Sequence, residues 1–430
     1  MIESKLAQIY EQFQQAEGIS TDTRKITQNS MFVALKGPSF DANKFAVEAL
    51  SKGAKFAVVD DPHIELAPGI ILVNDCLQFL QDLARYHRKK LQCPVIGITG
   101  SNGKTTTKEL LFAVLKNKFE TYSTQGNLNN HIGVPLTILA IPLTAEMAIV
   151  EMGANHIGEI ADLCTIAQPT HGIITNIGHA HIEGFGSFEG VLRAKSELYH
   201  YLIEHQGIAF VNSSDEVLKN MSKRFGKPVF YPSVGDFFEA TFIEANPFVK
   251  FSDSDGKLHE TNLLGKYNFI NIAAALCIGT YFGVDSSEAY RTAENYIPDN
   301  NRSQIIQHGS NTIILDAYNA NPSSMDVAID SFDEINNVNK VVILGDMFEL
   351  GNISELEHQK IGEKLSNSSI SHVLLVGDQM RFAQKACAGS KHFTTKMDLV
   401  EYLKKEKFDH AHILIKASRG IGLETIVDYL

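Results

Sequence analysis

The clearest chemical signal in this 430-residue sequence is a glycine-rich turn between an apolar strand and a helix. The turn reads Thr99-Gly100-Ser101-Asn102-Gly103-Lys104-Thr105-Thr106. Glycines let the backbone curl with its N–H groups pointing at phosphate oxygens, and the helix N-terminus adds about half a positive charge. In such a loop Lys104 bridges the β- and γ-phosphates and the Thr105 hydroxyl coordinates Mg²⁺. The turn therefore predicts a site for a nucleoside triphosphate.

The loop is a short variant of the common phosphate-binding pattern. That pattern places a glycine five residues before the Gly of Gly-Lys, and this sequence has Ile98 there. The match is to T-G-x-x-G-K-T, and the alternative interpretation is an ordinary glycine-rich turn from strand to helix. The loop alone leaves open what the triphosphate is used for.

The elements around the loop alternate between strand and helix. From Pro94 the strand PVIGITG runs into the helix KTTTKELLFAVLKN, and further strands are expected at residues 148–151 and 172–176. After a break at residues 298–302, four more strands are expected, starting at Thr312, Lys340, His372 and His412. This alternation predicts mostly parallel sheets with helices on both faces, whose ligands collect at the carboxyl ends of the strands.

These changes in pattern predict an α/β protein of three domains. Residues 1–90 mix short apolar runs, at 31–35 and 56–59, with helical segments. Residues 91–305 hold the phosphate loop and its parallel sheet, and residues 306–430 form the second alternating section. A chain of this length exceeds one ordinary core, which agrees with several domains.

Composition and charge exclude several classes of function. The net charge is −12 and no block of Lys or Arg follows the pattern of a nucleic-acid binder, so we expect no nucleic-acid partner. No apolar run reaches about 18 residues, so we expect no membrane span. The first residues lack the order of a signal peptide, which favours the cytoplasm. The five scattered cysteines argue against zinc and against a disulfide scaffold.

Further motifs follow the loop in a characteristic order. They are Gly126-Asn127-Leu128-Asn129-Asn130, Glu151-Met152-Gly153-Ala154-Asn155-His156, Asn176-Ile177-Gly178-His179-Ala180-His181, residues 183–187 (EGFGS) and Ala194-Lys195. Together with TGSNGKTTTK, they resemble the Mur ligase family. The resemblance extends over nearly the whole chain, through residues 20–24, 265–268, 301–302, 316–322 and 344–351. The segments GNLNN, EMGANHIGEI and AHIEGFGS are similar to the branch of the family that adds a dipeptide.

The resemblance implies an ATP-dependent carbon–nitrogen ligase. Such an enzyme joins D-alanyl-D-alanine to UDP-N-acetylmuramoyl-tripeptide through an acyl-phosphate, and it releases the pentapeptide precursor of peptidoglycan, ADP and phosphate. It also implies a uridine-nucleotide domain at 1–90, an ATPase domain at 91–305, and a Rossmann-like domain at 306–430 that contacts ATP and the dipeptide. A cytoplasmic monomer is expected.

The resemblance also implies two Mg²⁺ ions. Thr105 and Glu151 would hold one between the β- and γ-phosphates, and His181 would ligate the second. Lys195 would carry a carbamate derived from CO₂, which turns a cation into an anion suited to the metal. From the residues alone, Glu151 could merely close a strand, His181 could be a hydrogen-bonded structural histidine, and Lys195 could be a lysine on a helix surface.

The remaining functional residues are carried over from the matching motifs. Catalytic roles fall on Lys104, Glu151, His181 and Lys195. The residues expected to bind ATP are Gly100, Ser101, Asn102, Gly103, Lys104, Thr105, Thr106, Asn271, Arg302 and Asp316. Those expected to bind the other substrates are Asp22, Thr23, Arg24, Asn127, Asn129, Asn155, His156, Asn319, Ser418 and Arg419. Without the resemblance, Asn271 could cap a helix and Asp316 could cap a turn.

Two positions depart from the family pattern. Tyr267 stands where the family usually has His, and Asp41-Ala42-Asn43 stands where Asp-Gly-His is more usual. Three other functions remain as alternatives: a relative that adds a single amino acid, a small-molecule phosphotransferase or NTPase, and a non-catalytic nucleotide-binding paralogue. The third residue of the tripeptide, diaminopimelate or lysine, stays open.

Overall fold

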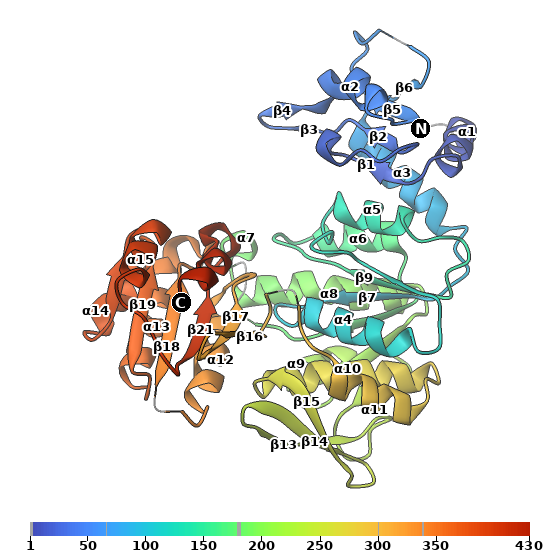
Figure 1. Ribbon diagram of the computed structural model, residues 1–430. Coiled ribbons are helices and arrows are strands. Elements are labelled where there is room, and N and C mark those ends of the chain that lie inside the picture. The colour runs from blue at the N-terminus through green and yellow to red at the C-terminus, as the bar shows by residue number, and fades with distance from the viewer. Residues whose placement is uncertain (1–2, 66, 179–181, 300, 338) are drawn as a thin grey trace.

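The protein consists of an N-terminal, a central and a C-terminal α/β body (Figure 1). The computed structural model describes residues 3–430 except 66, 179–181, 300 and 338. The N-terminal body lies at the top of Figure 1, the central body below it, and the C-terminal body to the left. In the described residues the two largest sheets have six strands each.

The N-terminal body is a small parallel sheet with helices around it. Its strands are, in spatial order, β1 (Ile19–Ser20), β2 (Met31–Val33), β5 (Phe56–Val59) and β6 (Ile70–Leu72). The other elements are α1 (Glu3–Gln14), η1 (Thr23–Lys25), the hairpin β3 (Lys36–Gly37) and β4 (Phe40–Asp41), η2 (Ala42–Phe45), α2 (Ala46–Ser51) and α3 (Cys76–Arg88). Every residue of β2 is buried, as expected for a strand covered on both faces.

The central body is a six-stranded parallel sheet that carries the phosphate loop. Its strands are, in spatial order, β12 (Val229–Tyr231), β11 (Ile208–Asn212), β10 (His171–Ile174), β7 (Val95–Thr99), β9 (Met147–Glu151) and β8 (Thr121–Ser123). Its helices are α4 (Lys104–Leu115), α5 (Gly133–Leu139), α6 (Glu159–Ala167), α7 (Ile182–Phe185), α8 (Phe188–Glu204), α9 (Glu216–Ser222), α10 (Tyr267–Tyr281) and α11 (Ser286–Asn295). The core strands β7 and β9 are buried along their whole length.

A three-stranded antiparallel sheet is inserted before α10. It consists of β13 (Ala240–Ala245), β14 (Phe248–Asp253) and β15 (Leu258–Leu264). The strand-and-helix pattern of the sequence did not predict this sheet, because its strands alternate apolar and polar residues instead of forming continuous apolar runs.

The C-terminal body is a second six-stranded sheet. Its strands are, in spatial order, β16 (Gln304–His308), β17 (Asn311–Asp316), β21 (His412–Lys416), β18 (Lys340–Gly345), β19 (His372–Val376) and β20 (Lys391–Phe393). Only β16 runs antiparallel in the described sheet. The helical segments are α12 (Pro322–Asp333), η3 (Gly351–Ile353), α13 (Ser354–Ser366), α14 (Met380–Ala386), α15 (Lys396–Leu403), η4 (Arg419–Ile421) and η5 (Leu423–Tyr429).

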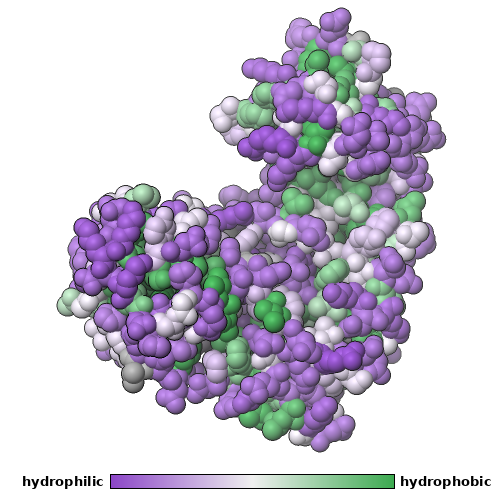
Figure 2. Space-filling model, viewed as in Figure 1, coloured by the Kyte–Doolittle hydropathy of each residue, from purple (hydrophilic) through white to green (hydrophobic). Residues whose placement is uncertain are grey.

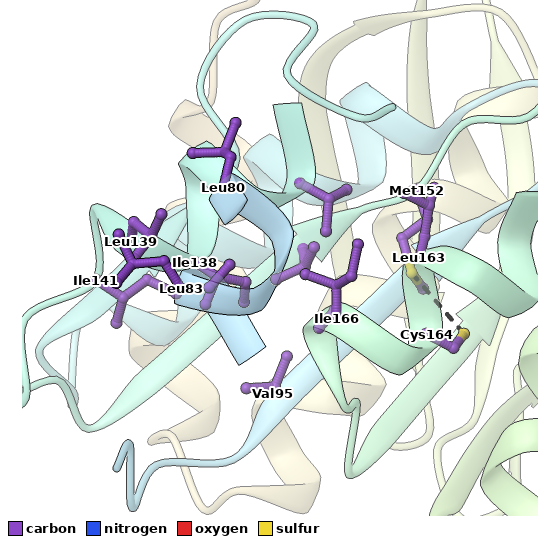
Figure 3. Packing of buried hydrophobic residues seen from close by; sticks show 14 of the residues in the cluster. Leu80, Leu83, Val95, Ile138, Leu139, Ile141, Met152, Leu163, Cys164 and Ile166 are labelled. Atoms are coloured by element: carbon purple, nitrogen blue, oxygen red, sulfur yellow. Dashed lines mark hydrogen bonds between the residues drawn. The ribbon is translucent and has the colours of Figure 1, made fainter. Parts of the chain in front are cut away.

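Helix α3 joins the N-terminal and central bodies. Leu80 and Leu83 of α3 belong to one apolar cluster with Ile138 of α5 and Leu163 and Ile166 of α6 (Figure 3). Burial of several such side chains removes a large apolar area from water, which holds α3 against the central body.

The α/β class and the expected strands of the two large sheets are confirmed. The strands predicted at 148–151 and 172–176 form at Met147–Glu151 and His171–Ile174, and the helix after the loop begins at Lys104. The proposed division at 90/91 and 305/306 stays a prediction, and β16 spans its second boundary. In the described part of the chain, no helix combines the length and apolar content needed to cross a bilayer.

Candidate active site

The phosphate loop links β7 to α4 and depends on two glycines. Gly100 has φ +143° and Gly103 has φ +78°, conformations that residues with a side chain rarely adopt. A Cβ at Gly100 would lie 2.1 Å from Thr175 Oγ1, and one at Gly103 would lie 2.6 Å from Asn271 Oδ1. The loop therefore needs glycine at both positions for its backbone path and for its neighbours.

Neighbouring groups hold the loop and its lysine in place. The backbone N–H of Ser101 donates to the Asn176 carbonyl at 3.1 Å, and that of Asn102 donates to Asn176 Oδ1 at 3.0 Å. Lys104 Nζ donates to the carbonyls of Gly100 at 2.6 Å and of Ser101 at 3.2 Å. Burial lowers the pKa of Lys104 to about 8, so its ammonium remains mostly charged at neutral pH. The cation therefore sits inside the loop that would receive the phosphates.

Thr105 and Glu151 form a paired oxygen site beside the loop. Glu151 ends β9, the sheet neighbour of β7, and is 2% exposed. Its Oε2 accepts the Thr105 hydroxyl at 2.9 Å, and its Oε1 accepts Asn129 Nδ2 at 2.8 Å. A hydroxyl and a carboxylate are hard oxygen ligands, so this pair fits Mg²⁺ bound together with phosphate oxygens. The described residues hold no cluster of three His, Cys, Asp or Glu side chains that could bind a metal without a nucleotide, and His181 lies outside them.

Lys195 is enclosed by the protein. It lies on α8, is 1% exposed, and donates to the Ala154 carbonyl at 3.4 Å. Its Nζ stands 5.1 Å from the centroid of the Phe185 ring. Burial, and next the charge of Lys104, lower the pKa of Lys195 to about 7. The interpretation of Lys195 as a helix-surface lysine is therefore wrong.

Asn271 lies inside a helix, where it supports the phosphate loop. Helix α10 begins at Tyr267, so Asn271 cannot cap it and that alternative is wrong. Its Oδ1 accepts the Thr107 hydroxyl at 3.1 Å, and its Nδ2 donates to Asn268 Oδ1 at 2.9 Å. Asn271 thus connects α10 to the first turn of α4.

The carboxyl ends of two C-terminal strands carry an ion pair. Asp316 ends β17 and Lys416 ends the adjacent β21, and Asp316 Oδ2 lies 2.6 Å from Lys416 Nζ. Asp316 Oδ1 accepts the backbone N–H of Ser303 at 3.1 Å. The Ser303 hydroxyl in turn lies 2.8 Å from the Tyr267 hydroxyl, which supplies a hydrogen bond at the position where His is usual.

Two arginines lie against one tyrosine ring. The Cζ atom of Arg302 is 3.9 Å from the centroid of the Tyr318 ring, and that of Arg419 is 5.3 Å from it. The buried Nε of Arg302 has no hydrogen-bond partner among the described residues. Arg302 is also close enough to Lys104 for its charge to lower the Lys104 pKa. A positive region therefore faces the phosphate loop.

Side chains of α12 bond directly to the phosphate loop. Asn102 Nδ2 donates to Ser323 Oγ at 2.8 Å, and Asn321 Nδ2 donates to Asn102 Oδ1 at 2.9 Å. Asn321 also caps α12, whose first residue is Pro322. These bonds join residues more than two hundred positions apart, and they attach the C-terminal body to the loop.

A cavity of about 1080 Å³ unites these groups. Figure 2, which has the view of Figure 1, shows a hollow between the N-terminal and C-terminal bodies. The predicted site residues that line it are Ser101, Asn102, Gly103, Lys104, Thr105, Thr106, Asn127, Asn129, Glu151, Asn155, Asn271, Arg302, Asp316, Asn319, Ser418 and Arg419. The cavity also reaches Phe348 and Val327, which the sequence analysis did not single out. Their apolar character carried no chemical signal in the sequence.

Six described residues of the predicted site are not part of the cavity wall: Gly100, Lys195, His156, Asp22, Thr23 and Arg24. Asp22 and Arg24 form an exposed ion pair in the N-terminal body at 2.8 Å, and its hydrogen bonds lower the Asp22 pKa to about 2. His156 Nδ1 lies 3.1 Å from Glu159 Oε1 on the surface. Gly100 and Lys195 lie behind the wall.

Asn43, which stands where the family usually has His, has a structural role in this protein. Asn43 is 1% exposed, and its Nδ2 donates to Asp41 Oδ1 and to Asp60 Oδ1, each at 2.8 Å. Lys36 Nζ pairs with the same Asp60 oxygen at 2.8 Å. Asn43 thus ties the β3–β4 hairpin to the end of β5.

Comparison with known proteins agrees with this architecture. Residues 98–279 match the model of the Mur ligase middle domain, and residues 301–419 match that of the Mur ligase, glutamate ligase domain. The chain is 36% identical over 434 residues to UDP-N-acetylmuramoyl-tripeptide--D-alanyl-D-alanine ligase of Bacillus subtilis (strain 168), which covers 95% of this chain and 92% of that protein.

Solved structures show the same fold over the full length. Crystal structure I of MurF from Acinetobacter baumannii superposes with a TM-score of 0.87 at 31% identity, covering 98% of this chain and 97% of that one. MurF from Thermotoga maritima in complex with ADP gives a TM-score of 0.83 at 27% identity, covering 96% of each chain. The chain belongs to the Mur ligase family.

Proposed function

We propose that this chain is an ATP-dependent ligase that adds D-alanyl-D-alanine to UDP-N-acetylmuramoyl-tripeptide. The observation that carries the proposal is that one cavity joins the phosphate loop and Glu151 to the cations Arg302 and Arg419. The relative from Bacillus subtilis is named for this reaction, and the Thermotoga maritima structure holds ADP. Both similarities extend over nearly the whole chain.

The proposed reaction has two steps. An oxygen of the tripeptide carboxylate attacks the γ-phosphorus of ATP, which forms an acyl-phosphate and releases ADP. The dipeptide amine then attacks the acyl carbon, the C–O bond to phosphate breaks, and the amine loses a proton. The products are the pentapeptide, ADP and phosphate.

The cationic residues of the cavity would stabilise charge during phosphoryl transfer. Lys104 would bridge the β- and γ-phosphates. Arg302 would neutralise negative charge on the phosphates from the opposite side of the cavity. Fixed cations of this kind favour the transition state because they need no reorganisation during the reaction. The unpartnered Nε of Arg302 supports this role, since a phosphate oxygen would supply its missing acceptor.

Thr105 and Glu151 would hold Mg²⁺ against the phosphates, with His181 at a second ion. The positive charge held by these residues would reduce the repulsion between the two anionic substrates. The backbone N–H groups of Ser101 and Asn102 now bond to Asn176, so the loop is already ordered. Asn129 fixes the second oxygen of Glu151, which keeps the carboxylate aimed at Thr105.

Lys195 would act as a carbamate. Its neutral amine would attack CO₂ to give the carbamate and a proton, and the product would carry a negative charge near Lys104. The charge of Lys104 contributes to the lowered pKa of Lys195, which supports this assignment because two buried cations repel each other.

The three bodies would divide the substrates among them. Residues 1–90, including Asp22, Thr23 and Arg24, would bind the uridine nucleotide. Residues 91–305 would bind the phosphates and the tripeptide, with Asn127, Asn155 and His156. Residues 306–430 would contact the ATP ribose through Asp316 and the dipeptide through Asn319, Ser418 and Arg419. We further propose that the enzyme works as a cytoplasmic monomer.

The test is phosphate release from ATP and Mg²⁺ with UDP-N-acetylmuramoyl-tripeptide, with D-alanyl-D-alanine or single amino acids as the acceptor. The proposal predicts release that requires the dipeptide. Release with a single amino acid would place the chain in another branch of the family. Release without any acceptor would contradict the ligase assignment and favour an NTPase. The same assay with diaminopimelate or lysine as third residue identifies the tripeptide.

A further inference from the structure

An exposed aromatic side chain forms part of the cavity wall. Phe348 follows β18 and is 45% exposed, and its ring forms part of the cavity wall. Val327 of α12 lines the same cavity and is 37% exposed. Leaving a phenylalanine exposed in a cavity forgoes the stabilisation that its burial would bring. A ligand with apolar groups would cover this ring.

The position of Phe348 is fixed from two sides. Its backbone N–H donates to Ser418 Oγ at 2.9 Å, and Ser418 is itself 2% exposed. Its ring lies on Gly420, where an added Cβ would approach Phe348 Cε2 to 2.7 Å. Glycine at position 420 therefore provides the space that the ring occupies. The aromatic surface is thus preformed.

A cation stands next to this surface. Arg419 precedes Gly420 and also lines the cavity. Among the described residues, the guanidinium of Arg419 lies 5.3 Å from the centroid of the Tyr318 ring and donates to the Tyr318 hydroxyl at 3.5 Å. None of the carboxylates in the described residues pairs with Arg419, whereas Lys416 nearby is bound to Asp316. Arg419 is therefore free to bind an anionic ligand.

We propose that Phe348 and Arg419 form the acceptor subsite, in which Phe348 packs on the methyl groups of D-alanyl-D-alanine and Arg419 binds its carboxylate. This inference rests on the proposed function. The dipeptide has two methyl groups, one carboxylate and one reactive amine, so an apolar surface beside a free cation matches it. A guanidinium binds a carboxylate through two parallel hydrogen bonds, which leaves the amine to face the acyl-phosphate.

The subsite predicts that the enzyme selects its acceptor partly through contacts with the methyl groups of the dipeptide. A missing methyl group changes transition-state binding by about tenfold or more when the pocket that receives it is apolar. Glycyl-glycine lacks both methyl groups and keeps the carboxylate. D-Alanyl-D-alaninamide keeps both methyl groups and lacks the carboxylate. The two analogues therefore probe the two parts of the subsite separately.

The first test compares Phe348→Ala and Phe348→Leu with the wild type. Phe348→Ala is expected to raise the KM for D-alanyl-D-alanine about tenfold and to reduce its advantage over glycyl-glycine. The KM values for ATP and for the nucleotide tripeptide are expected to stay unchanged. Phe348→Leu is expected to retain most of the selectivity for D-alanyl-D-alanine over glycyl-glycine, because leucine keeps an apolar surface. The control is Phe237→Ala, since Phe237 is 53% exposed and lies outside the cavity.

The second test uses Arg419→Gln. The wild type is expected to prefer D-alanyl-D-alanine over D-alanyl-D-alaninamide, and the variant is expected to lose that preference. A Phe348→Ala enzyme with unchanged dipeptide selectivity, or with a raised KM for ATP alone, would overturn the subsite. A wild type that does not use the dipeptide at all would contradict the proposed function instead, so the two failures are distinguishable.

Discussion

Thr105 and Glu151 meet at 2.9 Å, hydroxyl to carboxylate, although 46 positions separate them in the chain. Glu151 ends β9 and Thr105 lies in the first turn of the helix after β7, so the parallel pairing of these two strands brings them together. The second carboxylate oxygen is held by Asn129 at 2.8 Å. The pair is therefore an ordered oxygen site at the loop that would receive phosphates.

Replacing Glu151 with glutamine tests this site. Glu151→Gln keeps the size of the side chain and removes its charge, so we expect phosphate release to fall by about 100-fold or more. The Mg²⁺ concentration for half-maximal rate is expected to rise, because one anionic ligand is lost. The measurement is the rate of phosphate release across a Mg²⁺ titration. Glu204→Gln, an exposed site on α8, is the matched control, and an unchanged Mg²⁺ dependence in Glu151→Gln would refute the metal assignment.

Lys195 provides a second prediction. Lys195→Met fills the same buried space without an amine, so we expect a folded protein whose activity is almost lost. With ¹³C-labelled CO₂, the wild type is expected to show a carbamate carbonyl signal by NMR that the variant lacks. An active Lys195→Met enzyme, or a wild type without the signal, would show that the carbamate is not needed.

The ion pair at the ends of β17 and β21 predicts an effect on stability. Asp316→Ala leaves Lys416, whose side chain is 4% exposed, as an unpaired buried cation. We expect the free energy of unfolding of the C-terminal body to fall by about 3 kcal/mol. The double variant Asp316→Ala with Lys416→Met is expected to recover most of this loss. Urea unfolding of Asp316→Ala, of Lys416→Met and of the double variant measures the coupling, and additive losses would mean that the pair does not interact.

The burial of His171 predicts how the free energy of unfolding depends on pH. It lies among Phe210, Tyr281 and Phe282, and burial lowers its pKa from the usual 6.5 to about 4. Between these values the unfolded chain binds a proton that the folded chain does not, so stability is complete above pH 6.5 and falls as the pH drops toward 4. His171→Phe is expected to flatten this part of the curve, as measured by urea unfolding over the same pH range. Parallel curves for the two proteins would contradict the burial of a neutral imidazole.

The phosphate loop and the two large sheets could be predicted because their information is local. A glycine turn between an apolar strand and a helix, and a repeated alternation of strands and helices, are each contained in short stretches of sequence. Glu151 could be placed at the end of an apolar strand, but its role at the metal was implied by the family resemblance, and only the fold shows that its strand pairs with the strand before the loop. Because β7 and β9 run parallel, the phosphate loop and Glu151 lie at the same edge of the sheet.

The rest of the site depends on contacts between distant residues. The bonds from Asn102 to Asn321 and Ser323 cross between two bodies, and no local pattern specifies how those bodies dock. Phe348 was overlooked because an apolar residue after a strand is ordinarily a core residue, and only the folded cavity shows its exposure. Burial likewise distinguishes Lys195 from a surface lysine, and burial is a property of the assembled α8.

The most direct measurement follows the carboxylate oxygen of the tripeptide. UDP-N-acetylmuramoyl-tripeptide labelled with ¹⁸O in its terminal carboxylate is incubated with the enzyme, ATP, Mg²⁺ and D-alanyl-D-alanine. The masses of the products are then measured by mass spectrometry. We expect a nucleotide product extended by one dipeptide unit and one ¹⁸O atom in each released phosphate, since the acyl C–O bond breaks in the second step. Unlabelled phosphate with no extended product would contradict ligation through an acyl-phosphate.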